Sequence, residues 1–189
     1  MKEPESFPFL QKLSHHDPYT VRHSVGTAIN CIMLAQKIGI KDPKLLNDIG
    51  TAGLLHDIGK VKIDPGIINK PGKLDPQEWE VMQTHSAEGF ELVRNNDSID
   101  ERAKRAILEH HEEKEGTGYP LKLHFDEVDQ FSKIVAISDI FNAITTNRPY
   151  SKALTPFEAF QLIKEKMPHK IDEELLRHLI LLYGGSLPD

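Results

Sequence analysis

Histidines and aspartates within apolar sequence are the residues of this chain best suited to chemistry. The chain has 189 residues and ten histidines, against four tyrosines and one tryptophan. An ionisable side chain on a buried helix face is costly unless it is paired, hydrogen-bonded or bound to a metal ion. The candidates are His23, His56, Asp57, His85, His110, His111 and Asp139. Imidazole and carboxylate together suit Fe, Mn, Ni or Zn rather than Ca, which prefers all-oxygen sites.

Taken singly, several candidates also have a purely structural interpretation. His23 can be a hydrogen-bonded core histidine, and Asp139 can be a buried hydrogen-bonding residue within the apolar stretch KIVAISDIF. His85 can be a partly exposed side chain without a function. The case for a metal centre therefore depends on the set of residues rather than on one of them.

Two adjacent pairs limit the geometry of such a site. Neighbouring side chains of a helix diverge by about 100°, so His56-Asp57 and His110-His111 cannot each share one face within a helix. The pairs must lie at helix ends or serve two different metals, and a carboxylate has two oxygens with which to bridge them. Ligands contributed by several helices can converge in a bundle core.

The elements that position these residues are predicted to be helices separated by Pro and Gly. Pairs of a capping residue and proline mark four helix starts: Asp17-Pro18, Asp42-Pro43, Asp75-Pro76 and Thr155-Pro156. Helices are expected over residues 18–37, 43–57, 76–95, 99–111, 128–147, 156–167 and 172–183. Residues 61–74 are expected to be loop or extended. In the first helix the apolar positions form one stripe: Val21, Val25, Ala28, Ile29, Ile32 and Ala35.

These patterns predict an all-α fold, a single-domain bundle of about seven helices with a metal centre in its core. Residues 1–16 are expected to be a tail or linker remnant, and residues 17–189 the domain. Composition fits, with 39% hydrophobic and 28% charged residues. The net charge of −6 argues against binding of DNA or RNA duplexes.

The sequence also favours a cytoplasmic protein without membrane contact. No apolar run approaches the ~20 residues needed to span a bilayer, and the start MKEPESFPFL lacks a signal-peptide pattern. Cys31 is the single cysteine, so no internal disulfide can form. That is compatible with a reducing compartment.

Three motifs resemble those of a known enzyme family. HDIGK, residues 56–60, resembles the signature of the HD superfamily of phosphohydrolases. HHEEKEGTGYP, residues 110–120, and SDIFNAITTNRPYSKA, residues 138–153, resemble later motifs of its HD-GYP subfamily. The likeness runs from about residue 19 to residue 163.

The resemblance implies an all-helical phosphodiesterase that hydrolyses cyclic di-GMP to linear pGpG, GMP or both, through a hydroxide activated by two metal ions. It places His23, His56, Asp57 and Asp139 on one metal, and His85, His110, His111 and a bridging Asp57 on the other. The ions would be divalent, foremost Fe or Mn, with Ni, Zn or Mg as alternatives. Some relatives bind a third metal through a glutamate where this chain has Tyr19, so two metals are expected.

The resemblance also suggests roles around the substrate. Catalytic roles fall to Asp57 and Lys60, with Lys60 stabilising phosphate charge. Substrate contacts are expected from Lys60, Gly118, Tyr119, Arg148 and Lys152, and Glu112 is expected to orient a histidine. Lys60 can instead be a solvated lysine at a helix end, Arg148 a surface arginine, and Gly116 and Gly118 the residues of a simple chain reversal.

Two departures from the family pattern leave other functions open. Glu113 and Glu115 replace the usual Arg and Asp, and Ser151 stands where a basic residue is common. The alternatives are a hydrolase of another cyclic dinucleotide or nucleotide, and a catalytically weak cyclic di-GMP sensor or interaction module. Candidate protein partners are a sensory or receiver domain, a diguanylate cyclase and a second copy of the chain.

Overall fold

Helices account for the regular structure of the computed structural model, which describes residues 18–147 and 152–184. They are α2 (Pro18–Lys37), α3 (Pro43–Leu55), the 3-10 helix η1 (Ile58–Lys62), α4 (Pro65–Ile68), α5 (Pro76–Gln83), α6 (His85–Val93), α7 (Glu101–Glu109), α8 (Gln130–Thr145), α9 (Pro156–Lys166) and α10 (Glu173–Leu182). Within these ranges no strand forms, and a single bridge joins Glu115 to His124. The all-α prediction is confirmed, while the expected tail over residues 1–16 lies outside the described residues.

Side-chain caps explain where most helices begin. Asp42, Asp75 and Thr155 each accept hydrogen bonds from backbone N–H groups of the first turn, and proline follows each of them. Asp17 lies outside the described residues. A further cap was not predicted: Asp64 starts α4 in the same way, inside the segment expected to be loop.

The expected helix over residues 76–95 is wrong in one respect, because it is divided at Thr84. The Thr84 hydroxyl donates to the Val81 carbonyl at 2.8 Å, and the His85 ring donates to the Met82 carbonyl at 2.7 Å. Such side-chain bonds compete with the helical hydrogen-bond ladder. His85 therefore stands at the start of α6 instead of in the middle of a long helix. The other expected helices begin and end within two residues of their predicted limits.

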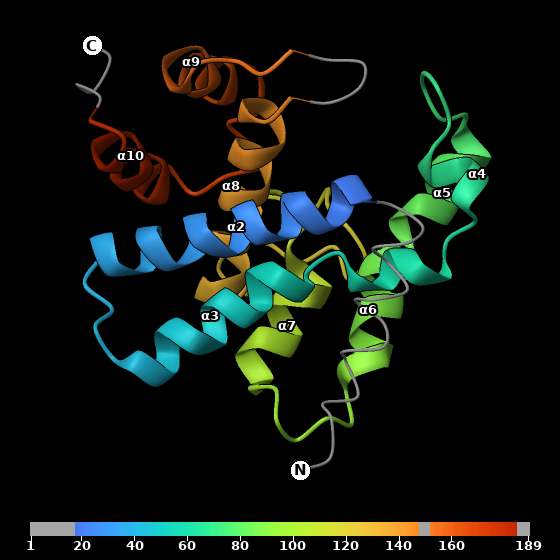
Figure 1. Ribbon diagram of the computed structural model, residues 1–189, viewed down its shortest axis with the longest axis horizontal. Coiled ribbons are helices and arrows are strands. Elements are labelled where there is room, and N and C mark those ends of the chain that lie inside the picture. The colour runs from blue at the N-terminus through green and yellow to red at the C-terminus, as the bar shows by residue number, and fades with distance from the viewer. Residues whose placement is uncertain (1–17, 148–151, 185–189) are drawn as a thin grey trace.

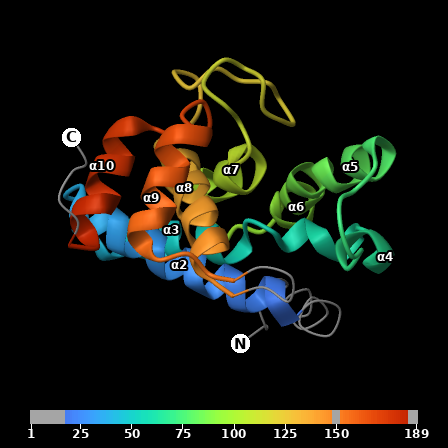
Figure 2. The same cartoon turned by 90° about the horizontal axis from the view of Figure 1, so that it is seen from above.

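The helices pack around one apolar core. α2 crosses α3 and α8, while α7 contacts α3, α6 and α8 (Figure 1). Fully buried Leu34, Ile49, Ile107 and Phe141 belong to this core. Helices α4, α5 and α6 extend to the side opposite α9 and α10 (Figure 2). In the described part of the chain, no helix is both long and apolar enough to cross a membrane.

The orientation of α2 differs from the predicted apolar stripe. Val25 and Ile29 are 46% and 52% exposed, although both belong to the apolar stripe predicted from the sequence. The buried face of the helix carries mostly polar side chains instead: Thr20, His23, Ser24, Thr27 and Asn30, followed by Cys31, Leu34 and Ala35. In this orientation His23 faces α8 and contacts Asp139. At this end of α2 the buried face is therefore polar and does not follow the apolar stripe.

Candidate metal centre

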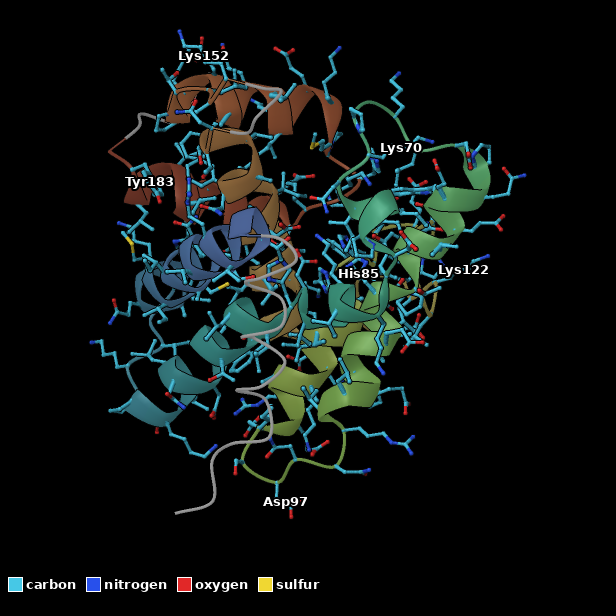
Figure 3. The ribbon with its side chains drawn as sticks, turned by 45° about the vertical axis from the view of Figure 1, so that its right-hand side comes forward. Lys70, His85, Asp97, Lys122, Lys152 and Tyr183 are labelled. Atoms are coloured by element: carbon cyan, nitrogen blue, oxygen red, sulfur yellow. The ribbon has the colours of Figure 1, made fainter. Side chains whose placement is uncertain are left out.

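The histidines and aspartates singled out from the sequence converge from separate helices. His56 and His110 are the C-cap residues of α3 and α7, so both adjacent pairs lie at helix ends as expected. Among the described residues, three groups could each hold an ion, with the ligand atoms of each group within 4.8 Å of one another. One of them, His56, Asp57 and His110, shares a histidine with each of the other two. The α2/α8 group consists of His23, His56 and Asp139, and the α6/α7 group consists of His85, His110 and His111. Figure 3 shows His85 in the body of the molecule, where η1 and α6 meet.

Asp57 lies between the two groups. Its Oδ2 is 3.3 Å from His56 Nε2, and its Oδ1 is 3.3 Å from His85 Nε2. Burial raises the pKa of this carboxyl, but the charges of Lys60 and His56 outweigh burial and hold the pKa well below its usual range. Asp57 is therefore an ionised carboxylate with one oxygen toward each group, which is the arrangement that a bridging ligand needs.

Backbone carbonyls orient three of the histidine rings. The Nδ1–H groups of His56, His85 and His110 donate to the carbonyls of Gly53, Met82 and Ile107 at 2.8, 2.7 and 2.9 Å. Each carbonyl belongs to the residue three positions earlier in the chain. This second hydrogen bond turns Nε2 toward the centre, as in metal-binding histidines generally.

The Nε2 atoms of His85, His110 and His111 are suited to binding a metal ion. Burial lowers the pKa of His85 to about 4 and that of His110 to about 3, so both rings are neutral near pH 7. Their Nε2 lone pairs then face each other at 3.4 Å, an arrangement that is repulsive without a cation between them. His111 Nε2 lies 3.2 Å from His85 Nε2.

His56 gives a second test of the fit. Its Nε2 is buried and has no hydrogen-bond partner among the described residues. Burial lowers the pKa of His56, but the charges of Asp57 and Asp139 outweigh burial and raise it. The site thus attracts positive charge at this point, and a bound divalent ion would supply it in place of a proton.

Close packing of η1 on α6 brings Asp57 and His85 together. A Cβ on Gly59 would lie 1.9 Å from the His85 carbonyl oxygen and 2.5 Å from the Gly89 nitrogen. Both are backbone atoms, so the two elements would have to separate to admit even a methyl group.

Gly59→Ala should therefore lower the free energy of unfolding by about 3 kcal/mol, the upper part of the usual range for overpacking. Urea titration of the purified protein measures this value. Gly50→Ala is the matched control, because its Cβ would meet only the flexible end of Ile32 at 2.8 Å. Equal stability of the two variants would contradict the close-packing argument.

A cavity of about 770 Å³ opens over the candidate metal ligands. This volume lies within the range of small-molecule sites. The residues that line it include Asn69, Lys70 and Trp79 from the segment of α4 and α5, and Ile144 and Lys170 from later in the chain. Figure 3 shows Lys70 beside α4 and α5. The four polar or aromatic wall residues were not predicted from the sequence, although a single tryptophan on a helix with a polar surface is a usable signal.

Two predicted substrate-binding residues line this cavity. Lys60 Nζ donates to Asp57 Oδ2 at 2.7 Å, and its side chain is 22% exposed. The Tyr119 ring stacks on His111 with centroids 4.6 Å apart and meets Trp79 edge-on at 6.3 Å. Both side chains lie where a ligand above the metal centre would contact them.

Glu112 and Gly118 make local backbone contacts that were not predicted. Glu112 accepts hydrogen bonds from the backbone N–H groups of Leu121 and Leu123 at 2.7 and 2.9 Å, so it anchors the loop rather than a histidine ring. A Cβ on Gly118 would lie 2.4 Å from the His111 carbonyl oxygen, so this glycine permits close backbone packing. The positive φ that allows the chain reversal belongs to Gly116, at 67°.

The remaining substrate-binding predictions are not placed at the cavity. Lys152 is exposed and is not among the described residues that line it. Figure 3 shows Lys152 at the outer edge of the molecule near α9. Arg148 and Ser151 lie outside the described residues.

Glu113, one of the departures from the family pattern, is tied into the cavity wall. It forms an ion pair with Lys170 and accepts a hydrogen bond from the Thr117 hydroxyl at 2.6 Å. Burial raises the pKa of Glu113, but the bonds from Lys170 and Thr117 outweigh it and lower the pKa. The change of charge at this position is thus balanced locally by Lys170.

Comparison with known proteins identifies relatives over most of the chain. The HD domain family model matches residues 10–175. A cyclic di-GMP phosphodiesterase of Pseudomonas aeruginosa is 33% identical over 97% of this chain and 44% of its own length. A 3'3'-cGAMP-specific phosphodiesterase of Vibrio cholerae is 35% identical over 83% of this chain and 34% of its own length. The chain thus spans less than half the length of these relatives.

A solved structure supports the fold assignment independently. The HDG"Y"P protein from Bdellovibrio bacteriovorus matches with a TM-score of 0.73 at 24% identity. The match covers 89% of this chain and 54% of that protein.

Proposed function

The chain belongs to the HD domain family, and we propose that it is a metal-dependent phosphodiesterase that hydrolyses cyclic di-GMP to linear pGpG, GMP or both. The observation that carries the proposal is the convergence of buried imidazole and carboxylate groups beneath an open cavity. The relatives named as cyclic dinucleotide phosphodiesterases support the same reaction class.

Two divalent ions, foremost iron or manganese, fit the ligand set. The α2/α8 group would hold one ion, the α6/α7 group would hold the other, and Asp57 would contact both. Bound ions of this kind polarise phosphoryl oxygens and lower the pKa of water.

Lys60 supports the centre in two ways. Its bond to Asp57 Oδ2 keeps this carboxylate ionised and oriented. Its position in the cavity wall also places a cation near the phosphodiester, where negative charge increases in the transition state.

Aromatic and cationic side chains of the cavity suit a dinucleotide. Tyr119 and the 48% exposed Trp79 offer ring faces to a purine base. Lys70 and Lys170 add two cations to the cavity lining, and each is held by a carboxylate, Glu78 and Glu113 respectively. These contacts would orient the substrate, while the ions held beneath it would polarise the phosphodiester.

A second candidate substrate is 3'3'-cGAMP, because a relative at 35% identity is specific for it. The two substrates differ in one base, and the described cavity walls offer both aromatic and charged contacts to a base. A cytoplasmic setting is part of the proposal, with a sensory or receiver domain, a diguanylate cyclase or a second copy as candidate partners.

A turnover assay tests the reaction. Protein loaded with manganese, or with ferrous iron without oxygen, is incubated with cyclic di-GMP or 3'3'-cGAMP, and products are separated chromatographically. We expect linear dinucleotide or GMP from cyclic di-GMP, and no product from His110→Ala. Metal-loaded protein that hydrolyses neither compound would overturn the proposal and favour a sensor, which a binding titration then identifies.

A further inference from the structure

The Nδ1 atom of His23 faces the Asn142 amide, whereas Nδ1 of His56, His85 and His110 faces a backbone carbonyl. We infer that Asn142 fixes the tautomer of His23 in the form that opposes metal binding, so that the α2/α8 group binds its ion more weakly than the α6/α7 group. The inference rests on the metal centre of the proposed function. It assigns Asn142 a positioning role toward that centre.

Asn142 makes two hydrogen bonds to His23 through one amide nitrogen. Nδ2 donates to the His23 carbonyl oxygen at 2.9 Å and lies 2.8 Å from His23 Nδ1. An amide nitrogen carries two hydrogens and accepts none. His23 Nδ1 is therefore the acceptor and carries no proton.

The Asn142 amide is held in this orientation. Turning it over would place Oδ1 against the His23 carbonyl oxygen, replacing a hydrogen bond by repulsion between two acceptors. The amide oxygen also packs on α2 at Gly26, where an added Cβ would lie 2.4 Å from it. Asn142 is 8% exposed, so water does not offer an easy alternative partner.

The consequence appears at the other ring nitrogen. A neutral imidazole without a proton on Nδ1 carries it on Nε2, and His23 Nε2 lies 2.7 Å from Asp139 Oδ1, to which it donates. Binding an ion through Nε2 requires this proton to leave, yet Nδ1 faces an N–H group and cannot receive it without displacing Asn142.

The α6/α7 group lacks this obstacle. His85 and His110 donate Nδ1–H to backbone carbonyls and present unprotonated Nε2 atoms to the centre. Since this is the tautomer that a metal requires, the structure predicts stepwise loading, with the α6/α7 group filled first.

Asn142→Asp tests the inference because a carboxylate accepts a proton from Nδ1. It also loses the bond to the His23 carbonyl, a loss that Asn142→Ala shares and therefore controls for. Manganese titration by calorimetry should resolve a tight and a weak step in the unchanged protein. In Asn142→Asp the weak step should tighten by about 10- to 100-fold, the usual range for such outer partners. Asn142→Ala removes the opposing donor without adding charge and should tighten the weak step less.

Thr146→Asp is the matched control for charge. It adds a carboxylate at the C-cap of α8, at a residue whose hydroxyl bonds to the Asn142 amide oxygen and not to the His23 ring. A weak step that tightens equally in Thr146→Asp and Asn142→Asp would overturn the inference. Equal affinity of both steps in the unchanged protein would also overturn it.

Nitrogen-15 NMR of the metal-free protein provides a readout independent of metal and of activity. We expect an unprotonated His23 Nδ1 in the unchanged protein and a protonated Nδ1 in Asn142→Asp. A protonated Nδ1 in the unchanged protein would refute the role of Asn142. Failure to bind metal in either group, with the expected tautomers, would instead refute the proposed function.

Discussion

Replacing Asp57 with asparagine should abolish turnover of the cyclic dinucleotide, with kcat/KM reduced by at least about 10³-fold, which corresponds to about 4 kcal/mol of transition-state stabilisation. The amide keeps the shape of the side chain but removes the negative charge between His56 and His85. The amide also has only one oxygen, whereas the carboxylate directs one oxygen toward His56 and the other toward His85. Both ligand groups therefore lose a shared anionic ligand.

Steady-state kinetics on metal-supplemented protein measures this effect, and metal content is determined on the same samples. Asp48→Asn is the matched control, since Asp48 is also a buried aspartate, lies in α3 and pairs with Lys44 at 2.7 Å, away from the centre. It should keep its turnover. Activity retained in Asp57→Asn would rule out the two-metal mechanism.

Metal loading should raise the thermal unfolding midpoint by about 8–16 °C. Free metal at about 1,000 times Kd stabilises the folded state by about 4 kcal/mol, and each kcal/mol shifts the midpoint of a chain of this size by about 2–4 °C. The physical reason is that the neutral rings of His85 and His110 face each other across 3.4 Å, so the ion replaces a repulsion by two bonds.

Differential scanning calorimetry with and without a chelator measures the shift. His85→Ala removes a ligand of the α6/α7 group and should lose most of it. His169→Ala removes an exposed histidine outside both groups and should retain it. An undiminished shift in His85→Ala would mean that the stabilising ion binds elsewhere.

Local chemistry in the sequence determined most helices and the types of ligand. Asp42, Asp75 and Thr155 cap helix starts because their side chains satisfy nearby backbone donors, an interaction within a few residues. The adjacent pair His56-Asp57 likewise implied a helix end, because neighbouring helical side chains diverge.

Packing between distant segments decided what the pattern could not. Val25 belongs to the predicted apolar stripe of α2 yet is exposed, because the helix is oriented so that His23 meets Asp139, 116 positions later in the chain. Helix α5 ends at Thr84 because the side chains of Thr84 and His85 donate hydrogen bonds to the carbonyls of Val81 and Met82. The spacing of apolar residues does not reveal such bonds.

The sequence likewise identifies the candidate ligands but not their protonation or their hydrogen-bond partners. The sequence alone determined that imidazole and carboxylate groups are available, and the family resemblance arranged them in two sets. Only the tertiary structure decided that Asn142 donates to His23 and that Glu112 holds a loop. Proton positions depend on partners brought within hydrogen-bond distance by helices far apart in sequence, and that distance is set by packing of the whole core.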